Sequence, residues 1–212
     1  MNMLTMMRLG AALSVVSLLT ACALGESAPT PKQLDLGAGA MTRATAGTST
    51  GGATALAPMP PIAVPPANAA SLLTEAMVVW RVGDQGQPQA YATYRWVAPP
   101  ARLVTQRIVD RLSLQGAVLQ QSIGAEVPQL RLNLQRFEQT FSVDGGSSQA
   151  QLTLQAVLVR GSEVVSQRLI NIQVPATTQD APGGALALRV ATDQAAEQVA
   201  QWLTSLRATL KR

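Results

Sequence analysis

Three runs of alternating apolar and polar residues in the second half of the chain limit its fold more than any other feature. The alternating apolar positions are Leu130, Leu132 and Leu134, then Ala150, Leu152, Leu154, Ala156 and Leu158, and finally Ile170, Ile172 and Val174. A period of two places one face of each run in a core, as in a half-buried strand. The turn sequences Asp144-Gly145-Gly146 and Gly161-Ser162-Glu163 separate the runs. Together these features predict a three-stranded antiparallel meander.

A hairpin and a helix are predicted before this meander. Met77–Val82 is an apolar, β-branched run that ends in a turn cluster at residues 83–86, and Ala90–Val97 follows as a second strand. Pro99-Pro100 is typical of a helix start, because proline is tolerated in a first turn. The helix that follows carries its apolar stripe at helical spacing, on Leu103, Val104, Ile108 and Leu112. A short strand is expected near Val118–Gln121.

The clearest helix signal follows a turn at residues 180–184. Its apolar face is formed by Leu188, Ala191, Ala195, Val199, Trp202 and Leu206. The order of elements predicts an α+β fold, in which an antiparallel sheet (hairpin plus three-stranded meander) carries two main helices packed on one face.

Composition excludes most kinds of active site. The 212 residues contain no histidine and one cysteine, which removes Ser-His-Asp and Cys-His nucleophilic sites, Cys/His zinc sites and any intrachain disulfide. The acids Glu126, Glu138, Asp110 and Asp193 show no close pairing that would indicate two cooperating carboxylates or an oxygen-ligand metal site. We therefore expect no catalytic residues, no metal and no cofactor, and the sequence predicts a protein that is not an enzyme.

The charges do not predict a nucleic-acid partner. Sixteen Lys+Arg against twelve Asp+Glu give a formal charge of +4, but the cations are scattered singly through the chain. Nucleic-acid binders usually gather cations into a stripe, often with aromatic residues between them.

The first 22 residues have the pattern of an export signal. Arg8 is their only charge, and the apolar stretch after it is too short to span a bilayer. Residues 19–22, Leu-Thr-Ala-Cys, resemble the bacterial lipobox, so we expect cleavage between Ala21 and Cys22 and acylation of Cys22, the only cysteine. An uncleaved signal anchor with a chance cysteine is the alternative. Ala23 follows the cysteine, and by analogy with the enterobacterial sorting rule the absence of Asp there indicates the outer membrane, on its periplasmic side.

Composition predicts three regions. Residues 1–21 are the signal peptide, residues 22–68 an acylated N-terminus with a tether rich in Gly, Ala, Thr and Pro, and residues 69–212 the single domain. Between Gly37 and Asn68 the sequence lacks the periodicity needed to bury a core. A tether of this length could reach about 160 Å when fully extended. Leu34-Asp35-Leu36 is the exception and could pair as a short edge strand.

Three residues near the predicted hairpin are candidates for contacting a partner: Arg81, Arg95 and Trp96. An arginine beside a tryptophan could stack on a lipid headgroup or a protein. The alternative is that the aromatic residues fill the core under the first helix, and Trp80 and Trp202 are expected to be core residues on the same reasoning.

Three segments resemble the ABC-type transport auxiliary lipoprotein family. They are LDLG at Leu34–Gly37, AMVVWRV with YATYRWVAPPARLVTQRI within Ala76–Ile108, and LRLNLQRFEQTF at Leu130–Phe141. The final helix, with Asp193, Gln198 and Trp202-Leu203, is also similar. The sequence departs from the family pattern in its longer tether and in having Trp80 where a tyrosine is expected.

The resemblance implies a role in lipid transport between the inner and outer membranes. The partners it implies are a mammalian-cell-entry (MCE) domain protein and an ABC permease/ATPase, with self-association into rings and attachment to the outer membrane through the lipid anchor. Two alternatives remain open: an assembly or activator lipoprotein for a secretin or a peptidoglycan synthase, and a soluble lipid carrier, which requires a sizeable apolar pocket.

Overall fold

The three alternating runs form the longest strands of the structure, a computed structural model that describes residues 30–38, 58–121 and 127–210. They are β7 (Gln129–Phe141), β8 (Ser148–Arg160) and β9 (Glu163–Pro175), and they pair antiparallel in that order. Leu130, Leu154 and Leu158 are fully buried. The predicted meander is confirmed.

The predicted hairpin is also present, but it joins the meander in parallel. β4 (Met77–Val82) and β5 (Gln89–Trp96) pair antiparallel, and β4 then runs parallel to the end of β7, with Trp80 opposite Gln139 and Val82 opposite Phe141. Parallel neighbours require a crossover connection, and the chain makes it through the helix that follows β5. The sheet is therefore mixed, and its antiparallel parts are the predicted hairpin and meander.

Four short strands complete the nine-stranded sheet of the described residues. β1 (Lys32–Leu34) lies parallel to β5, two residues earlier than the edge strand expected at 34–36. β2 (Ile62–Ala63) and β3 (Asn68–Ala69) pair with the first half of β7, and β6 (Val118–Leu119) pairs with β2 at the position expected from the sequence. A 3-10 turn, η1 (Ser71–Leu73), precedes β4.

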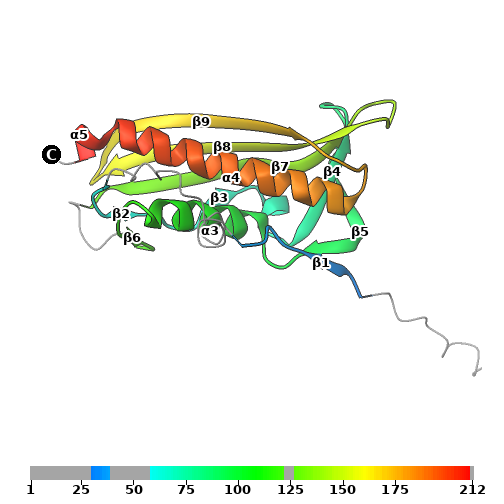
Figure 1. Cartoon of the computed structure of the whole chain (residues 1–212), viewed down its shortest axis with the longest axis horizontal. Coiled ribbons are helices and arrows are strands. Elements are labelled where there is room, and N and C mark those ends of the chain that lie inside the picture. Colours follow the sequence, from blue (N-terminus) through cyan, green and yellow to red (C-terminus); the bar gives the residue numbers. More distant parts are fainter. Residues whose placement is uncertain (1–29, 39–57, 122–126, 211–212) are drawn as a thin grey trace, which may run out of the picture. The chain divides into compact units, whose positions relative to one another are not determined.

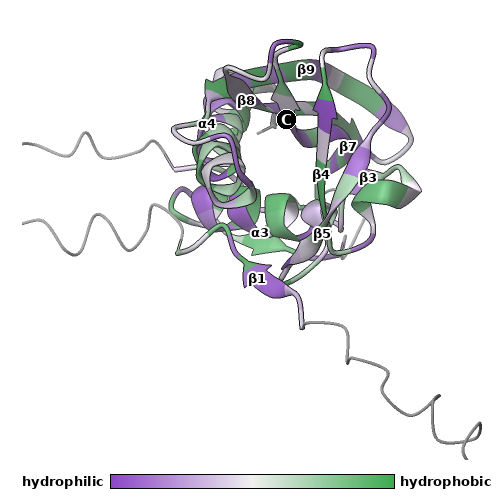
Figure 2. Cartoon of the chain, turned by 90° about the vertical axis from the view of Figure 1, so that its right-hand side faces the viewer, coloured by the Kyte–Doolittle hydropathy of each residue, from purple (hydrophilic) through white to green (hydrophobic). Residues whose placement is uncertain are grey.

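Two helices cover the concave face of the curled sheet. α4 (Ala181–Ser205) contacts β7, β8 and β9 along its length, and α3 (Pro100–Ser113) packs beside α4. Figure 1 shows both helices lying along the long strands, and Figure 2 shows them facing the inside of the curl. The side chain of Asp180 caps α4 by accepting a hydrogen bond from the Gly183 N–H, and a short helix, α5 (Arg207–Leu210), follows. The predicted α+β architecture is confirmed.

The segment before residue 69 contributes to the core, contrary to its composition. Met59, Ile62, Ala63 and Val64 are at most 6% exposed, and Leu36 is 2% exposed. The two-residue strand β2 fits between two proline pairs, so its N–H groups can still pair with neighbouring strands. The prediction that residues 37–68 lack core-forming residues is therefore wrong for residues 59–64. Residues 39–57, the signal peptide and Cys22 lie outside the described residues.

Candidate functional site

A wide irregularity in the β4–β5 pairing shapes one end of the domain. Met77 lies opposite Arg95 and Val79 opposite Ala90, so two steps along β4 correspond to five along β5. The extra residues form a bulge. Arg95 spans it, because its Nη1 donates to the carbonyl of Tyr91 at 2.6 Å and to that of Tyr94 at 2.7 Å. The bulge brings the rings of Tyr91 and Tyr94 into edge contact, with centroids 6.2 Å apart.

These tyrosines belong to a continuous row of aromatic side chains. Phe141 contacts Trp80 edge-on at a centroid distance of 5.8 Å, and Trp80 contacts Tyr91 at 6.0 Å. At the other end of the row, Nζ of Lys32 lies 6.0 Å from the centre of the Tyr94 ring. All four rings are partly exposed. We call Phe141, Trp80, Tyr91 and Tyr94 the aromatic row.

Three of the four residues of the aromatic row, Phe141, Trp80 and Tyr91, line a shallow apolar groove of about 320 Å³. Val82 and Val143 extend its rim, with exposed fractions of 43% and 87%. Val143 stands on a defined turn, because the Asp144 carboxylate accepts a hydrogen bond from the Gly146 N–H at 3.0 Å. The partly exposed rings and these two valines together form one contiguous apolar surface at this end of the domain.

A buried polar chain supports the groove from below. The hydroxyl of Tyr91 donates to Oε1 of Gln139 at 2.9 Å, and Nε2 of Gln139 donates to Oγ of Ser148 at 2.8 Å. Burial, together with the negative charge of Asp180 and the proximity of Tyr94, raises the pKa of Tyr91 to about 12. The Tyr91 hydroxyl therefore remains a neutral donor, which fixes its ring in the row.

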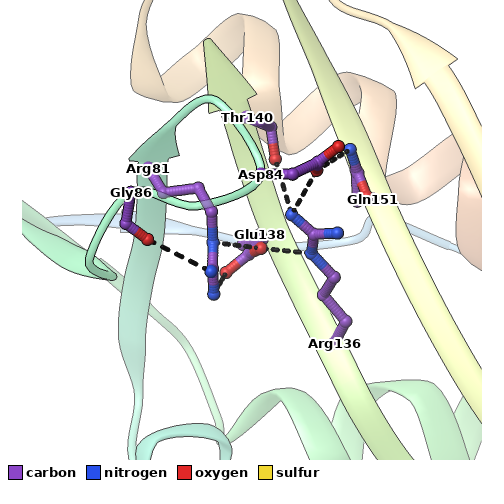
Figure 3. Close-up of polar contacts among 7 residues, drawn as sticks. All are labelled: Arg81, Asp84, Gly86, Arg136, Glu138, Thr140 and Gln151. Atoms are coloured by element: carbon purple, nitrogen blue, oxygen red, sulfur yellow. Dashed lines mark hydrogen bonds and ion pairs between the residues drawn. The ribbon is translucent and has the colours of Figure 1, made fainter.

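Four charged side chains stabilise the β4–β5 turn against β7 (Figure 3). The Glu138 carboxylate, only 4% exposed, accepts from Nη2 of Arg81 at 2.8 Å and also from Arg136. Arg136 reaches on to Asp84 at 3.0 Å, and Arg81 donates to the carbonyl of Gly86 at 3.2 Å. The positive charges of the two arginines are matched by the negative charges of Glu138 and Asp84. Because both cations are occupied, the cluster is a structural network and not an anion site.

A second arginine cluster fastens the N-terminal segment to the helices. Arg107, 5% exposed, bonds Asp193 on α4 and donates from Nη2 to the carbonyls of Leu36 and Gly37, both at 2.8 Å. Arg189 adds a bond to the carbonyl of Ala38 at 3.3 Å. The residues after β1 are thereby held on α3 and α4.

The sequence-derived candidates occupy different environments. Trp96 is 2% exposed and packs against Phe137, so it fills the core, as the alternative reading proposed. Arg81 is bound to Glu138, and Arg95 supports the bulge. Trp202 is buried as predicted, at 6% exposure, whereas the prediction of a core position for Trp80 is wrong, because the ring is partly exposed at the groove.

Sequence reasoning did not find the aromatic row. The chain has only three Trp, two Tyr and two Phe, and four of these residues lie between positions 80 and 96. This clustering of a rare residue type is the signal that was available. Phe141 joins the row only through the parallel pairing of β4 with β7, which no local pattern predicts.

The part of the chain that the structure describes contains neither a cluster of metal-ligand side chains nor a helix suited to span a membrane. Within residues 30–38, 58–121 and 127–210, no group of three or more Asp, Glu, His or Cys side chains is placed to hold a metal ion. In the same ranges, none of the helices combines the length and apolarity needed to cross a bilayer.

The fold and its end surface define a small α+β domain with a curled mixed sheet and an apolar rim. The family model for the ABC-type transport auxiliary lipoprotein component matches residues 41–200, and the chain belongs to this family. A crystal structure of a Xanthomonas campestris protein of family DUF330 is similar, with a TM-score of 0.63 and 21% identity over 70% of this chain and 87% of that one.

A second crystal structure, of an uncharacterized protein, has a TM-score of 0.61 and 14% identity over 82% of this chain and 99% of that one. At these identities the two structures confirm the fold alone. The comparison with curated proteins gave no match.

Proposed function

We propose that this protein is an outer-membrane lipoprotein that serves an MCE/ABC-type system for lipid transport between the inner and outer membranes. The observation that carries the proposal is membership of the ABC-type transport auxiliary lipoprotein family. A lipobox-like sequence ending in the only cysteine, Cys22, supports the anchor. Ala23 at the following position supports the outer membrane.

The protein acts by docking and not by catalysis. Its polar clusters are used internally: Glu138 is bound by two arginines, and Asp193 and Glu197 join α4 to α3 through Arg107 and Arg111. The partners are the MCE protein and its ABC permease/ATPase, and copies of the chain assemble with one another. Acyl chains on Cys22 confine the domain to a thin layer at the membrane, which raises its effective concentration for the partner.

The groove does not favour a soluble lipid carrier. Its volume of about 320 Å³ is at the lower limit of small-molecule pockets, and it is a shallow surface feature. The interior between sheet and helices is filled by side chains such as Leu154, Ile108 and Val199, all of them fully buried. A docking role requires only the outer surface.

Co-purification from the native envelope tests this proposal. The tagged lipoprotein is extracted in detergent, with the Cys22→Ser variant as the matched control. We expect the MCE protein and its permease to co-elute with the wild type, and this co-elution to be lost with the variant, which cannot be acylated at position 22. Co-elution of a secretin or a peptidoglycan synthase would instead assign the protein to envelope assembly. An unmodified Cys22 in the extracted wild-type protein would contradict the anchor.

A further inference from the structure

We propose that the aromatic row and the valine rim beside it form the membrane-facing surface of the domain, and that they contact the headgroup region of the bilayer holding the anchor. The inference rests on the proposed acylation of Cys22. It adds to the proposed function the orientation of the domain and the residues that meet the lipid.

The first argument is the length of chain between the anchor and the folded domain. Cys22 and Lys32, the first residue of β1, are ten residues apart, so they can be separated by at most about 35 Å. Composition predicts a tether of 47 residues, but β1 lies within that stretch and already belongs to the domain. Only the residues before β1 therefore separate the anchor from the folded unit.

The attachment of β1 is firm enough to transmit this constraint. β1 pairs with β5 from Lys32 opposite Tyr94 to Leu34 opposite Trp96, and the N–H of Val97 donates to the carbonyl of Leu34 at 2.9 Å. Leu36 is buried, and Arg107 holds its carbonyl from α3. The lipid anchor therefore pulls on this edge of the sheet.

The second argument is that the aromatic row begins where the anchor segment enters. Lys32 lies over the ring of Tyr94, and the row continues through Tyr91 and Trp80 to Phe141. Figure 2 views this end of the domain, where β1, β5 and β4 lie next to one another. A short connection to β1 favours an arrangement in which this end of the domain lies near the bilayer.

The third argument is chemical. Tyrosine and tryptophan rings carry a polar atom on an apolar body and favour the boundary between headgroups and acyl chains. Val82 and Val143 add exposed apolar area beside them. Lys32 at one end of the row is balanced by the acidic Asp180 near Tyr91. This mixture suits zwitterionic headgroups, which carry a phosphate and an amine, better than a purely anionic surface.

The membrane-facing end leaves the opposite end of the domain free. Figure 1 shows β6 and α5 at the far end of the long strands from β4 and β5. A domain oriented by the aromatic row presents that end toward the periplasm, where a transport partner would approach.

Tryptophan fluorescence tests the orientation directly, because the three tryptophans differ in environment. Trp96 and Trp202 are 2% and 6% exposed, so only Trp80 can approach lipid. The full acylated protein is reconstituted into phosphatidylethanolamine/phosphatidylcholine vesicles whose acyl chains are brominated near the headgroup. We expect bromine to quench the emission, and we expect this quenching to be lost in Trp80→Phe, which keeps an aromatic ring in the row.

A second variant tests the short connection. Insertion of a long Gly/Ser segment between Thr30 and Pro31 leaves the folded unit intact, and we expect it to reduce the quenching because the domain is then free to turn away. Equal quenching in wild type and Trp80→Phe, or no quenching in an acylated wild-type protein, would overturn the inference.

Mass spectrometry of the membrane-extracted protein measures acylation of Cys22 independently of the quenching. An unacylated chain contradicts the proposed anchor, whereas an acylated chain without quenching contradicts only the orientation.

Discussion

Nη2 of Arg107 donates to the carbonyl of Leu36 at 2.8 Å across 71 residues of sequence. The same guanidinium bonds Asp193 on α4, so one buried side chain joins the N-terminal segment, α3 and α4. This contact makes residues 32–38 part of the domain instead of part of a tether. It thereby determines how much free chain separates the folded unit from Cys22.

Replacing Arg107 by alanine should open this junction. We expect the free energy of unfolding to fall by about 2–3 kcal/mol, less than for a fully buried pair because the Asp193 side chain is 27% exposed. Urea unfolding measures the loss, with the exposed Arg102→Ala as the matched control. Hydrogen exchange of the Val97 amide, which donates to Leu34, should accelerate beyond the global effect. An unchanged local exchange rate would show that β1 is held by other contacts.

The two tryptophans of the hairpin should respond very differently to truncation. Trp96→Ala removes a side chain that is 2% exposed and packs against Phe137, so we expect a loss of about 3–5 kcal/mol. Trp80→Ala should cost clearly less, about 1–2 kcal/mol, because its ring is partly solvated at the groove. Chemical denaturation of both variants gives the comparison. Equal losses would mean that Trp80 is a core residue after all.

Local patterns were sufficient to predict the elements of the domain but not their connections. The alternation at Leu130–Leu134 and the stripe of α4 predicted a strand and a helix, because burial on one face imposes a period on the sequence. The parallel contact of Trp80 with Gln139 has no such signature, since it depends on where the α3 crossover returns the chain. The aromatic row was missed for this reason.

The core residues before position 69 were missed for a different reason. Ile62 and Val64 lie in a segment whose Pro, Ala and Gly content is typical of a linker. Composition averages over the segment, whereas two apolar side chains placed beside β6 and β7 are enough to dock it. In this chain, the short apolar segment between the two proline pairs packs into the domain and is not part of the linker.

The raised pKa of Tyr91 gives a spectroscopic test of the groove. The chain has two tyrosines, so the ultraviolet alkaline titration of the wild type minus that of Tyr91→Phe isolates the Tyr91 transition, which we expect near pH 12. An unfolded tyrosine ionises near 10, so the stability contributed by this group is present below pH 10 and is lost as the pH rises toward 12. Asp180→Asn removes a neighbouring negative charge and should lower the midpoint. A midpoint near 10 in the folded protein would contradict the burial of the hydroxyl.

Gly184 should not tolerate alanine, although alanine normally favours a helix by about 1 kcal/mol. A Cβ at this position of α4 would lie 2.1 Å from Oε1 of Gln139 and 3.2 Å from its Cβ. Gln139 is 1% exposed and is held by Tyr91 and Ser148, so it has little room to move. We expect Gly184→Ala to lower the free energy of unfolding by about 1–3 kcal/mol, as overpacking does.

A double-mutant cycle with Gln139→Ala separates this clash from a general effect on the helix. The second substitution removes the atoms that a new Cβ would meet, so Gly184→Ala should cost much less, or become stabilising, in the Gln139→Ala background. The Tyr91 titration provides an independent reading, because displacement of Gln139 breaks the hydrogen bond that its Oε1 accepts from the tyrosine hydroxyl. Strictly additive losses in urea unfolding, with an unchanged Tyr91 midpoint in Gly184→Ala, would show that α4 does not approach β7 as closely as the structure requires.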